Sequence, residues 1–204
     1  MNILTYDRLL KKTVEENTYK IHGLLFLYNR RAGRLLNVLL RRRFISVFYG
    51  SYMKSRRSVK LIPGFIKHYN IDVSEILRPL ESFKSFNDFF IRALKPDARP
   101  VDMEPAHLIS PADSRLFVFP ISTSTEFPVK GYWYNLDQLL KDKTLAEKYQ
   151  GGWCYIYRLA PSDYHRYTYI DNGTHEKVIK VNGLLHSVNP IALKVTKNLM
   201  TKNY

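Results

Sequence analysis

The stretch WCYIYRLAPSDYHR, residues 153–166, joins a strand-like run to a turn that carries an acid and an imidazole. Its first seven residues are mostly aromatic or aliphatic and run into a proline-containing turn, which is typical of a β-strand and its end. His165 lies just beyond that end. Turns held by rigid strands are where functional ionisable groups are usually placed. We therefore expect a β-rich core with His165 at a strand end.

Further short β-rich runs flank this stretch, separated by Pro, Gly, Asn and Asp residues. Together with the opening strand they cover 108–109, 115–119, 127–129, 153–159, 167–170 and 177–181. Asp171-Asn172-Gly173 is a hairpin signal. Only 136–149 is predicted to be helical in this half of the chain.

The first half of the chain favours helices. Leu, Val and Phe residues recur at spacings of three and four over 19–52. Shorter helices are predicted over 74–80, with Ser74 as N-cap, and over 85–92, followed by a turn-rich connector at 95–100. The sequence therefore predicts an α+β protein: a basic helical section over 1–80, then a mostly antiparallel β-rich core over 81–204 that is incomplete at its C-terminus.

The composition excludes several classes of protein. The 204 residues are 45% hydrophobic and 25% charged, as in a globular domain. The single cysteine, Cys154, has no disulfide partner and no metal-ligand spacing around it, so we expect a buried strand residue and no metal site. No secretory signal is readable, and the longest apolar run, 24–28, is far below the ~20 residues that span a bilayer.

The positive charge is concentrated in the first third of the chain. The net charge is +14, and residues 1–60 hold 14 basic and 3 acidic side chains, a net of +11. Such a field favours an anionic partner, either nucleic acid or an anionic lipid surface. The predicted helix over 19–52 fits a helix lying in a lipid interface, and it equally fits a helix packed on its own domain with a solvated basic face.

A second acid lies in a comparable turn. Asp113 closes Ser110-Pro111-Ala112-Asp113, immediately before the predicted strand at 115–119. Alone, an Asp in such a turn usually bonds its own backbone, and a single His is usually a packed or surface residue. Together, an acid and an imidazole on separate turns form a general acid/base device, but no nucleophile stands beside them.

Five blocks over 85–190 closely resemble phosphatidylserine decarboxylase proenzymes, in that family's order. The blocks are Phe89-Phe90-Ile91-Arg92-x-Leu94-Lys95-Pro96-x-Ala98-Arg99-Pro100-Val101-Asp102, Ser110-Pro111-Ala112-Asp113, Val129-Lys130-Gly131-x-x-Tyr134-x-Leu136-x-x-Leu139-Leu140, Pro161-x-Asp163-Tyr164-His165-Arg166 and Gly183-x-x-x-Ser187-Val188-Asn189-Pro190. The first third resembles the family only in being basic and helical, as in members that sit on membranes.

The resemblance implies an enzyme that makes its own cofactor. In the family an Asp-His pair activates a serine near the C-terminus, which attacks the preceding peptide carbonyl. Elimination then leaves a pyruvoyl group. Its carbonyl forms a Schiff base with the amine of phosphatidylserine and accepts the electrons left when carbon dioxide departs, giving phosphatidylethanolamine.

Residue roles follow from the same resemblance. Asp113 matches the family's processing aspartate. His165 matches the first histidine of Asp-Tyr-His-Arg-x-His, which is linked to substrate handling and decarboxylation. The matching blocks also supply the expected substrate-binding residues, Tyr164, Arg166, Ser187 and Asn189.

Three features depart from the family pattern. Ser114 stands where Gly normally follows Pro-Ala-Asp, and Thr168 stands where the family has its second histidine, the one associated with processing. Threonine cannot act as a base near neutral pH. The sequence ends at Tyr204 before a Gly-Ser pair in register, so we expect a truncated product or fragment with unpaired strand edges and a pyruvoyl group from a serine outside the chain.

Three functions remain to be compared. The leading hypothesis is a phosphatidylserine decarboxylase-like enzyme, peripheral on the cytoplasmic face of the cell membrane and completed by a C-terminal pyruvoyl-bearing segment or subunit. The alternative is a non-catalytic remnant of this scaffold that binds anionic lipid. A nucleic-acid binder is disfavoured, because the basic residues are segregated from most of the aromatic ones and no RNP motif is present.

Overall fold

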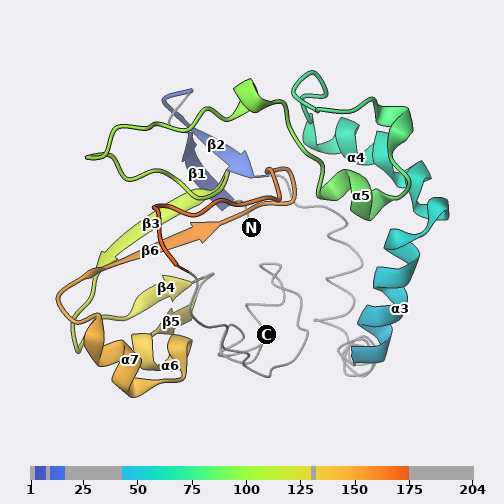
Figure 1. The fold of residues 1–204 in the computed structure, drawn as a ribbon. Helices are drawn as coiled ribbons and strands as arrows, with labels where there is room; N and C mark the ends of the chain where they lie inside the picture. The colour runs from blue at the N-terminus through green and yellow to red at the C-terminus, as the bar shows by residue number, and fades with distance from the viewer. Residues whose placement is uncertain (1–2, 8–9, 17–42, 130–131, 175–204) are drawn as a thin grey trace. The chain divides into compact units, whose positions relative to one another are not determined.

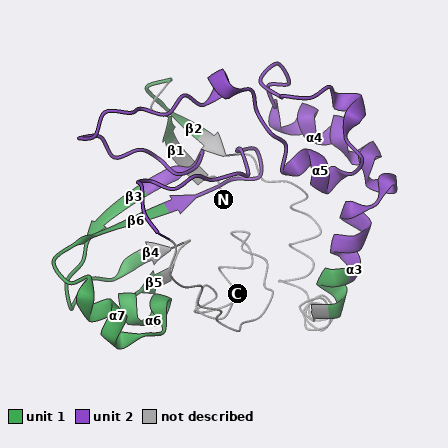
Figure 2. Cartoon of the chain, in the orientation of Figure 1, with its two compact units in different colours: residues 1–47, 117–156, 179–204 green, residues 48–116, 157–178 purple. Residues whose placement is uncertain are grey.

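The computed structural model describes residues 3–7, 10–16, 43–129 and 132–174. The chain divides into two compact units, of which unit 1 comprises 1–47, 117–156 and 179–204, and unit 2 comprises 48–116 and 157–178 (Figure 2). This division does not follow the expected boundary at residue 80. A separate N-terminal section therefore stays a prediction.

Unit 2 is chiefly helical. Its elements in chain order are α3 (Arg43–Lys54), which begins in unit 1, η1 (Arg56–Leu61), α4 (Ile62–Tyr69), η2 (Leu80–Ser82), α5 (Phe86–Phe90) and η3 (Pro96–Ala98) (Figure 1). The α5 helix starts because Ser85 caps it, the Ser85 Oγ accepting a hydrogen bond from the Asp88 amide at 3.1 Å. The helix predicted over 85–92 is confirmed, in a shorter form.

An aromatic cluster forms the core of unit 2. Phe65, Phe83 and Phe89 are buried, and the Phe89 ring lies edge-on to both of the others. Ser58 is buried beside this cluster and ties η1 to α5, because its Oγ accepts a hydrogen bond from the Phe86 amide at 2.8 Å. Packing therefore holds the 86–95 segment, which carries part of the site, against α4 and η1.

Unit 1 holds most of the strands. Its elements are β1 (Ile3–Asp7), β2 (Lys12–Glu16), β3 (Arg115–Pro120), β4 (Phe127–Val129), β5 (Tyr132–Tyr134), α6 (Leu136–Leu140), α7 (Lys143–Lys148) and β6 (Trp153–Arg158), with the first two residues of β3 and the last two of β6 belonging to unit 2. The strands pair as β1 with β2, β3 with β6 and β4 with β5. The first and last of these pairs are antiparallel. The predicted α+β class and the strands at 115–119, 127–129 and 153–159 are confirmed.

The N-terminal and central predictions need correction. The first 16 residues contain the β1–β2 hairpin, whereas the sequence predicted a helical section from residue 1. Residues 43–54 of the long predicted helix are helical, and 17–42 lie outside the described residues. Ser74 caps no helix. Its amide and Oγ instead donate to Asp72 Oδ1 at 2.8 and 2.7 Å, which closes a turn where a helix over 74–80 was expected.

Three predictions in the second half were also wrong. Segments 108–109 and 167–170 are not strands. The expected helix over 136–149 is broken between α6 and α7, because Lys141 takes a left-handed conformation with φ 55° and ends α6. Strand β5 was missed, and the strand predicted over 177–181 lies outside the described residues. Cys154 is in a strand as expected but is only half-buried.

Candidate active site

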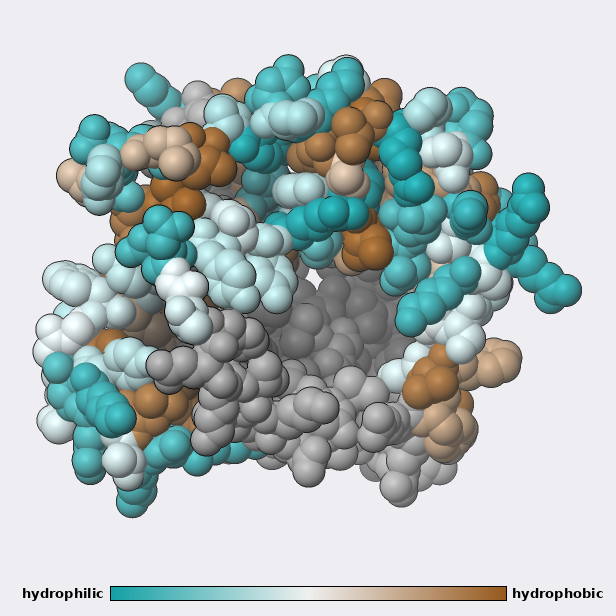
Figure 3. Space-filling model, in the orientation of Figure 1, coloured by the Kyte–Doolittle hydropathy of each residue, from teal (hydrophilic) through white to brown (hydrophobic). Residues whose placement is uncertain are grey.

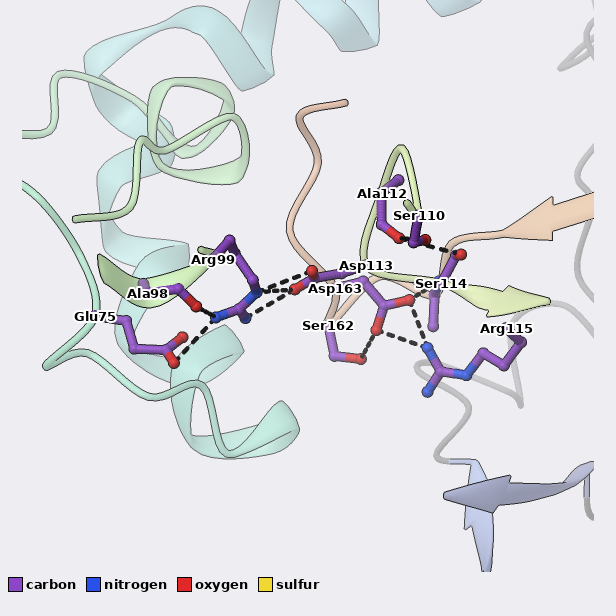
Figure 4. A network of polar contacts seen from close by, with 11 residues as sticks. Glu75, Ala98, Arg99, Ser110, Ala112, Asp113, Ser114, Arg115, Ser162 and Asp163 are labelled. Carbon is purple, nitrogen blue, oxygen red and sulfur yellow. Dashed lines mark hydrogen bonds and ion pairs between the residues drawn. The ribbon is translucent and has the colours of Figure 1, made fainter. Parts of the chain in front are cut away.

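The turn that carries His165 is held by its neighbouring acid. Asp163 Oδ2 accepts a hydrogen bond from the Ala160 amide at 2.7 Å, and the Asp163 amide donates to the Ala160 carbonyl at 3.0 Å. Arg115, the first residue of β3, brings Nη1 to 2.6 and 2.5 Å from the two carboxylate oxygens of Asp163 (Figure 4). The turn that follows β6 and the start of β3 are thereby joined by an ion pair that lies largely away from solvent.

His165 is packed against the aromatic cluster. Its ring stacks on that of Phe90, with centroids 4.0 Å apart and an interplanar angle of 25°. Burial lowers the pKa of His165 below its ordinary value of 6.5, against an opposing hydrogen bond to the Pro161 backbone. Its Nε2 is buried and has no hydrogen-bond partner among the described residues.

The surroundings of His165 favour the neutral imidazole. Burial is the main cause of its lowered pKa, because burial disfavours the charged form. Nε2 is a buried ring nitrogen with no hydrogen-bond partner among the described residues. An imidazole nitrogen in this position can exchange a proton with a ligand.

Asp113 is bound by an arginine. Nε of Arg99 donates to both carboxylate oxygens at 2.9 and 2.8 Å, and Nη2 lies 2.8 Å from Oδ2 (Figure 4). Nη1 of the same guanidinium donates to Glu75 at 3.1 Å. These two carboxylates raise the pKa of Arg99 above its usual range. The Asp113 carboxylate is therefore fixed in place as the acceptor of a forked guanidinium.

The two turns are joined by the backbone. The Thr168 amide donates to the Pro111 carbonyl at 2.9 Å, which brings the segment after His165 to the turn that ends at Asp113. Arg166 Nε donates to the Ile91 carbonyl at 2.9 Å, and this exposed side chain reaches the segment beyond α5. The position where the family has its second histidine thus lies beside the acidic turn.

Arg92 is a residue to which sequence reasoning assigned no role. Its side chain follows α5, is only 4% exposed, and lies with its guanidinium carbon 5.2 Å from the centroid of the Phe89 ring. Burial lowers the pKa of Arg92, while the nearby Tyr164 and Asp113 act in the opposite direction. The sequence signal was its place in the first block of the family pattern.

The structure brings some of the predicted residues together and not others. Asp113 and His165 lie in the same unit, and both fall within the electrostatic range of Arg92. They are not bonded to each other in the described chain, because Asp113 is bonded to Arg99. Tyr164 is half-buried and also acts on the pKa of Arg92. Ser187 and Asn189 lie outside the described residues.

The described residues contain neither a metal-binding cluster nor a membrane-spanning helix. No group of three or more His, Cys, Asp or Glu side chains there could hold a metal ion. Among the same residues, no helix combines the length and the apolar character needed to cross a bilayer.

Comparison with known proteins gives a consistent family. Residues 86–204 match the family model described as phosphatidylserine decarboxylase. A curated relative from Clostridium novyi, named phosphatidylserine decarboxylase proenzyme, is 44% identical over 97% of this chain and 65% of the relative. Another of the same name, from Clostridium perfringens, is 39% identical over 95% of this chain and 67% of the relative. A third, from Clostridium tetani, is 41% identical over 95% of this chain and 66% of the relative.

The fold and site define an α+β protein whose ionisable side chains lie on turns at strand ends, beside a buried guanidinium. The chain belongs to the phosphatidylserine decarboxylase family. It spans about two thirds of the length of these curated relatives.

Proposed function

We propose that this chain contributes the main acid/base site of an enzyme that converts phosphatidylserine to phosphatidylethanolamine and carbon dioxide. The observation that carries the proposal is His165, whose buried Nε2 is free of partners within the described chain while its ring is fixed on Phe90. A buried polar atom without a partner is costly unless a ligand uses it.

The chemistry required of His165 is transfer of one proton. A neutral Nε2 can take a proton from the substrate's ammonium group, which frees the amine to react. The same nitrogen can later return that proton to the carbon that loses carbon dioxide, so that no net proton is consumed at the histidine. Stacking on Phe90 and the ion pair that holds the Asp163 turn keep the ring in one orientation for both transfers.

A pyruvoyl group would supply an electrophilic carbonyl and a sink for electrons. One feature of the described residues fits such a group, namely Nε2 of His165, a buried polar atom that has no hydrogen-bond partner among them and could bond a carbonyl compound. We propose that a C-terminal segment or subunit carries it. Asp113, in the turn tied to Thr168, is proposed to act in the processing reaction that creates it.

Substrate contacts are proposed for the residues around His165. Tyr164 and Arg166 flank it in sequence, and the Arg166 side chain is anchored at the Ile91 carbonyl. Ser187 and Asn189 are proposed on the resemblance alone.

The enzymatic proposal is tested with the protein expressed from its complete gene and phosphatidylserine labelled at the serine carboxyl. Release of labelled carbon dioxide is expected from the wild type, and His165→Gln should lower turnover by about 100-fold or more, the usual contribution of a general acid/base. His107→Gln is the matched control, because His107 is an exposed histidine of the same unit paired with Asp102. A wild-type protein that releases no carbon dioxide would refute the proposal.

We further propose that the protein binds the anionic cytoplasmic face of the cell membrane peripherally, through α3. Large apolar side chains are exposed along this helix, at Phe44, Val47, Phe48 and Tyr49 (Figure 3). The stretch 41–60 contains seven basic residues, Lys60 included, and no acidic one. Exposed aromatic residues beside basic ones are the composition of a helix in a lipid interface.

Co-sedimentation with vesicles that contain phosphatidylserine tests this proposal. Phe48→Glu should weaken binding, and raising the salt concentration should weaken it further because the basic residues supply long-range attraction. Met103→Glu introduces the same charge at another exposed apolar residue and should have little effect. Equal binding by the two variants would contradict a role for α3.

A further inference from the structure

Arg92 carries a charge that the described chain does not neutralise by direct contact. Its side chain is 96% buried, and neither Nε nor Nη1 has a hydrogen-bond partner there. A buried guanidinium with unused donors costs free energy, and proteins normally pair such a group with an anion. Its five donors form a planar fork that matches carboxylate and phosphate oxygens.

The nearby carboxylates are already taken. Asp113 receives both Nε and Nη2 of Arg99, and Glu75 receives its Nη1. Arg99 and Arg92 both lie close enough to these acids to be affected electrostatically, but only Arg99 bonds to them. Among the described residues, these two carboxylates are therefore paired with Arg99, and Nε and Nη1 of Arg92 are left without an anion.

The backbone fixes Arg92 beside the proposed acid/base site. The Arg92 amide donates to the Phe89 carbonyl at 3.0 Å, which closes the turn at the end of α5. On its other side, the Leu77 amide donates to the Ala93 carbonyl at 3.0 Å. The His165 ring stacks on Phe90, two residues before Arg92, with the ring centroids 4.0 Å apart. Burial is the main cause that lowers the pKa of His165, and the charge of Arg92 acts in the same direction. A ligand bonded to one would lie near the other.

We propose that Arg92 binds the phosphodiester of the phospholipid headgroup, and this rests on the proposed function. The headgroup has two anions, the phosphodiester and the serine carboxylate. A cation held on the carboxylate would stabilise the charge that must be lost as carbon dioxide, and so would oppose the reaction. The phosphodiester is unchanged by the reaction, so binding it holds substrate and transition state equally.

Arg92→Met tests the assignment, with Arg78→Met as the matched control. Arg78 also lies over a phenylalanine ring of the same cluster, 4.4 Å from the Phe83 centroid, but its Nη2 is paired with Asp88 at 2.7 Å. Arg92→Met should raise the KM for phosphatidylserine by about tenfold or more, the scale of a lost charge-assisted hydrogen bond, with kcat within a fewfold of wild type. Arg78→Met should leave KM unchanged.

Thermal unfolding supplies a readout that a structural role would not produce. Replacing an unpaired buried cation by an apolar side chain is expected to leave the melting temperature unchanged or to raise it, whereas Arg78→Met should lower it. If Arg92→Met lowers the melting temperature as Arg78→Met does and leaves the KM unchanged, Arg92 has a structural role. A fall in kcat at constant KM would overturn the phosphodiester assignment.

Binding probes separate this inference from the decarboxylase activity. Glycerophosphoethanolamine, which has the phosphodiester but no carboxylate, should bind the wild type and bind Arg92→Met at least about tenfold more weakly. Inorganic phosphate distinguishes a free-phosphate site from a headgroup site, and binding as tight as that of glycerophosphoethanolamine would overturn the headgroup assignment. These titrations are followed by NMR of the arginine side chains. They decide the role of Arg92 even if no carbon dioxide is released.

Discussion

Breaking the Arg115–Asp163 ion pair should be among the most damaging changes to unit 2. The side chains are only 23% and 12% exposed, and Asp163 also accepts the Ala160 amide. Removing one partner of a fully buried pair costs about 3–5 kcal/mol, which partial exposure reduces to about 2–3 kcal/mol here. Asp163→Ala also leaves the Ala160 amide unsatisfied, adding about 1 kcal/mol.

We therefore expect Asp163→Ala to lower the free energy of unfolding by about 3–4 kcal/mol and Arg115→Ala by about 2 kcal/mol, since Asp163 then keeps its bond to Ala160. The assay is urea denaturation of both single variants and the double variant, followed by tryptophan fluorescence. The double-mutant cycle should return a coupling energy of about 1.5–2 kcal/mol.

The Asp102–His107 pair is the matched control. His107 Nδ1 and Asp102 Oδ2 lie 2.7 Å apart, but the side chains of Asp102 and His107 are 55% and 60% exposed. Solvent screening should therefore reduce the coupling to below about 0.5 kcal/mol. Equal coupling in the two cycles would refute the reasoning, because burial would then add nothing to the Arg115–Asp163 pair.

Three further predictions concern the same unit. Burial lowers the pKa of His165 below 6.5, so the folded chain binds fewer protons than the unfolded chain as the pH falls through 6.5, and the free energy of unfolding should decline below that pH. His165→Gln should reduce this decline when denaturation is measured across pH. An unchanged slope of stability against pH in the variant would contradict the prediction. Ser58→Ala removes the buried hydroxyl that accepts from the Phe86 amide, and it should cost about 1–3 kcal/mol in urea denaturation. A cost near zero would mean that another acceptor replaces the hydroxyl. Thr168→His places an imidazole beside the turn of Asp113. In the complete gene product this variant should speed self-cleavage, which gel electrophoresis would follow. An unchanged rate of self-cleavage would mean that this position does not carry the processing base.

Local residue patterns predicted much of the secondary structure. Strands over 115–119 and 153–159 were readable because apolar and aromatic residues are continuous there and turn residues bound them. The start of α5 was readable because Ser85 is a good cap and its acceptor role involves only the next turn. Signals of this kind are contained in neighbouring residues.

The wrong predictions arose where one local signal had two possible outcomes. Ser74 after Asp72 can begin a helix or close a turn, and here both Ser74 donors go to the Asp72 carboxylate. The break at Lys141 required a left-handed lysine, which propensity does not indicate. The β1–β2 hairpin lay in a polar stretch with no strong strand pattern.

The sequence by itself determined which residues stand on turns, among them Asp113 and His165, and through five ordered blocks it indicated the family. Only the tertiary structure decided their partners. Asp113 is bonded by Arg99, 14 residues away, and Asp163 by Arg115, 48 residues away. Nε and Nη1 of Arg92 have no partner among the described residues, and this too is visible only after the neighbouring charges have been paired. Propensity acts over a few residues, whereas ion pairs and burial depend on which distant segments the chain path brings together.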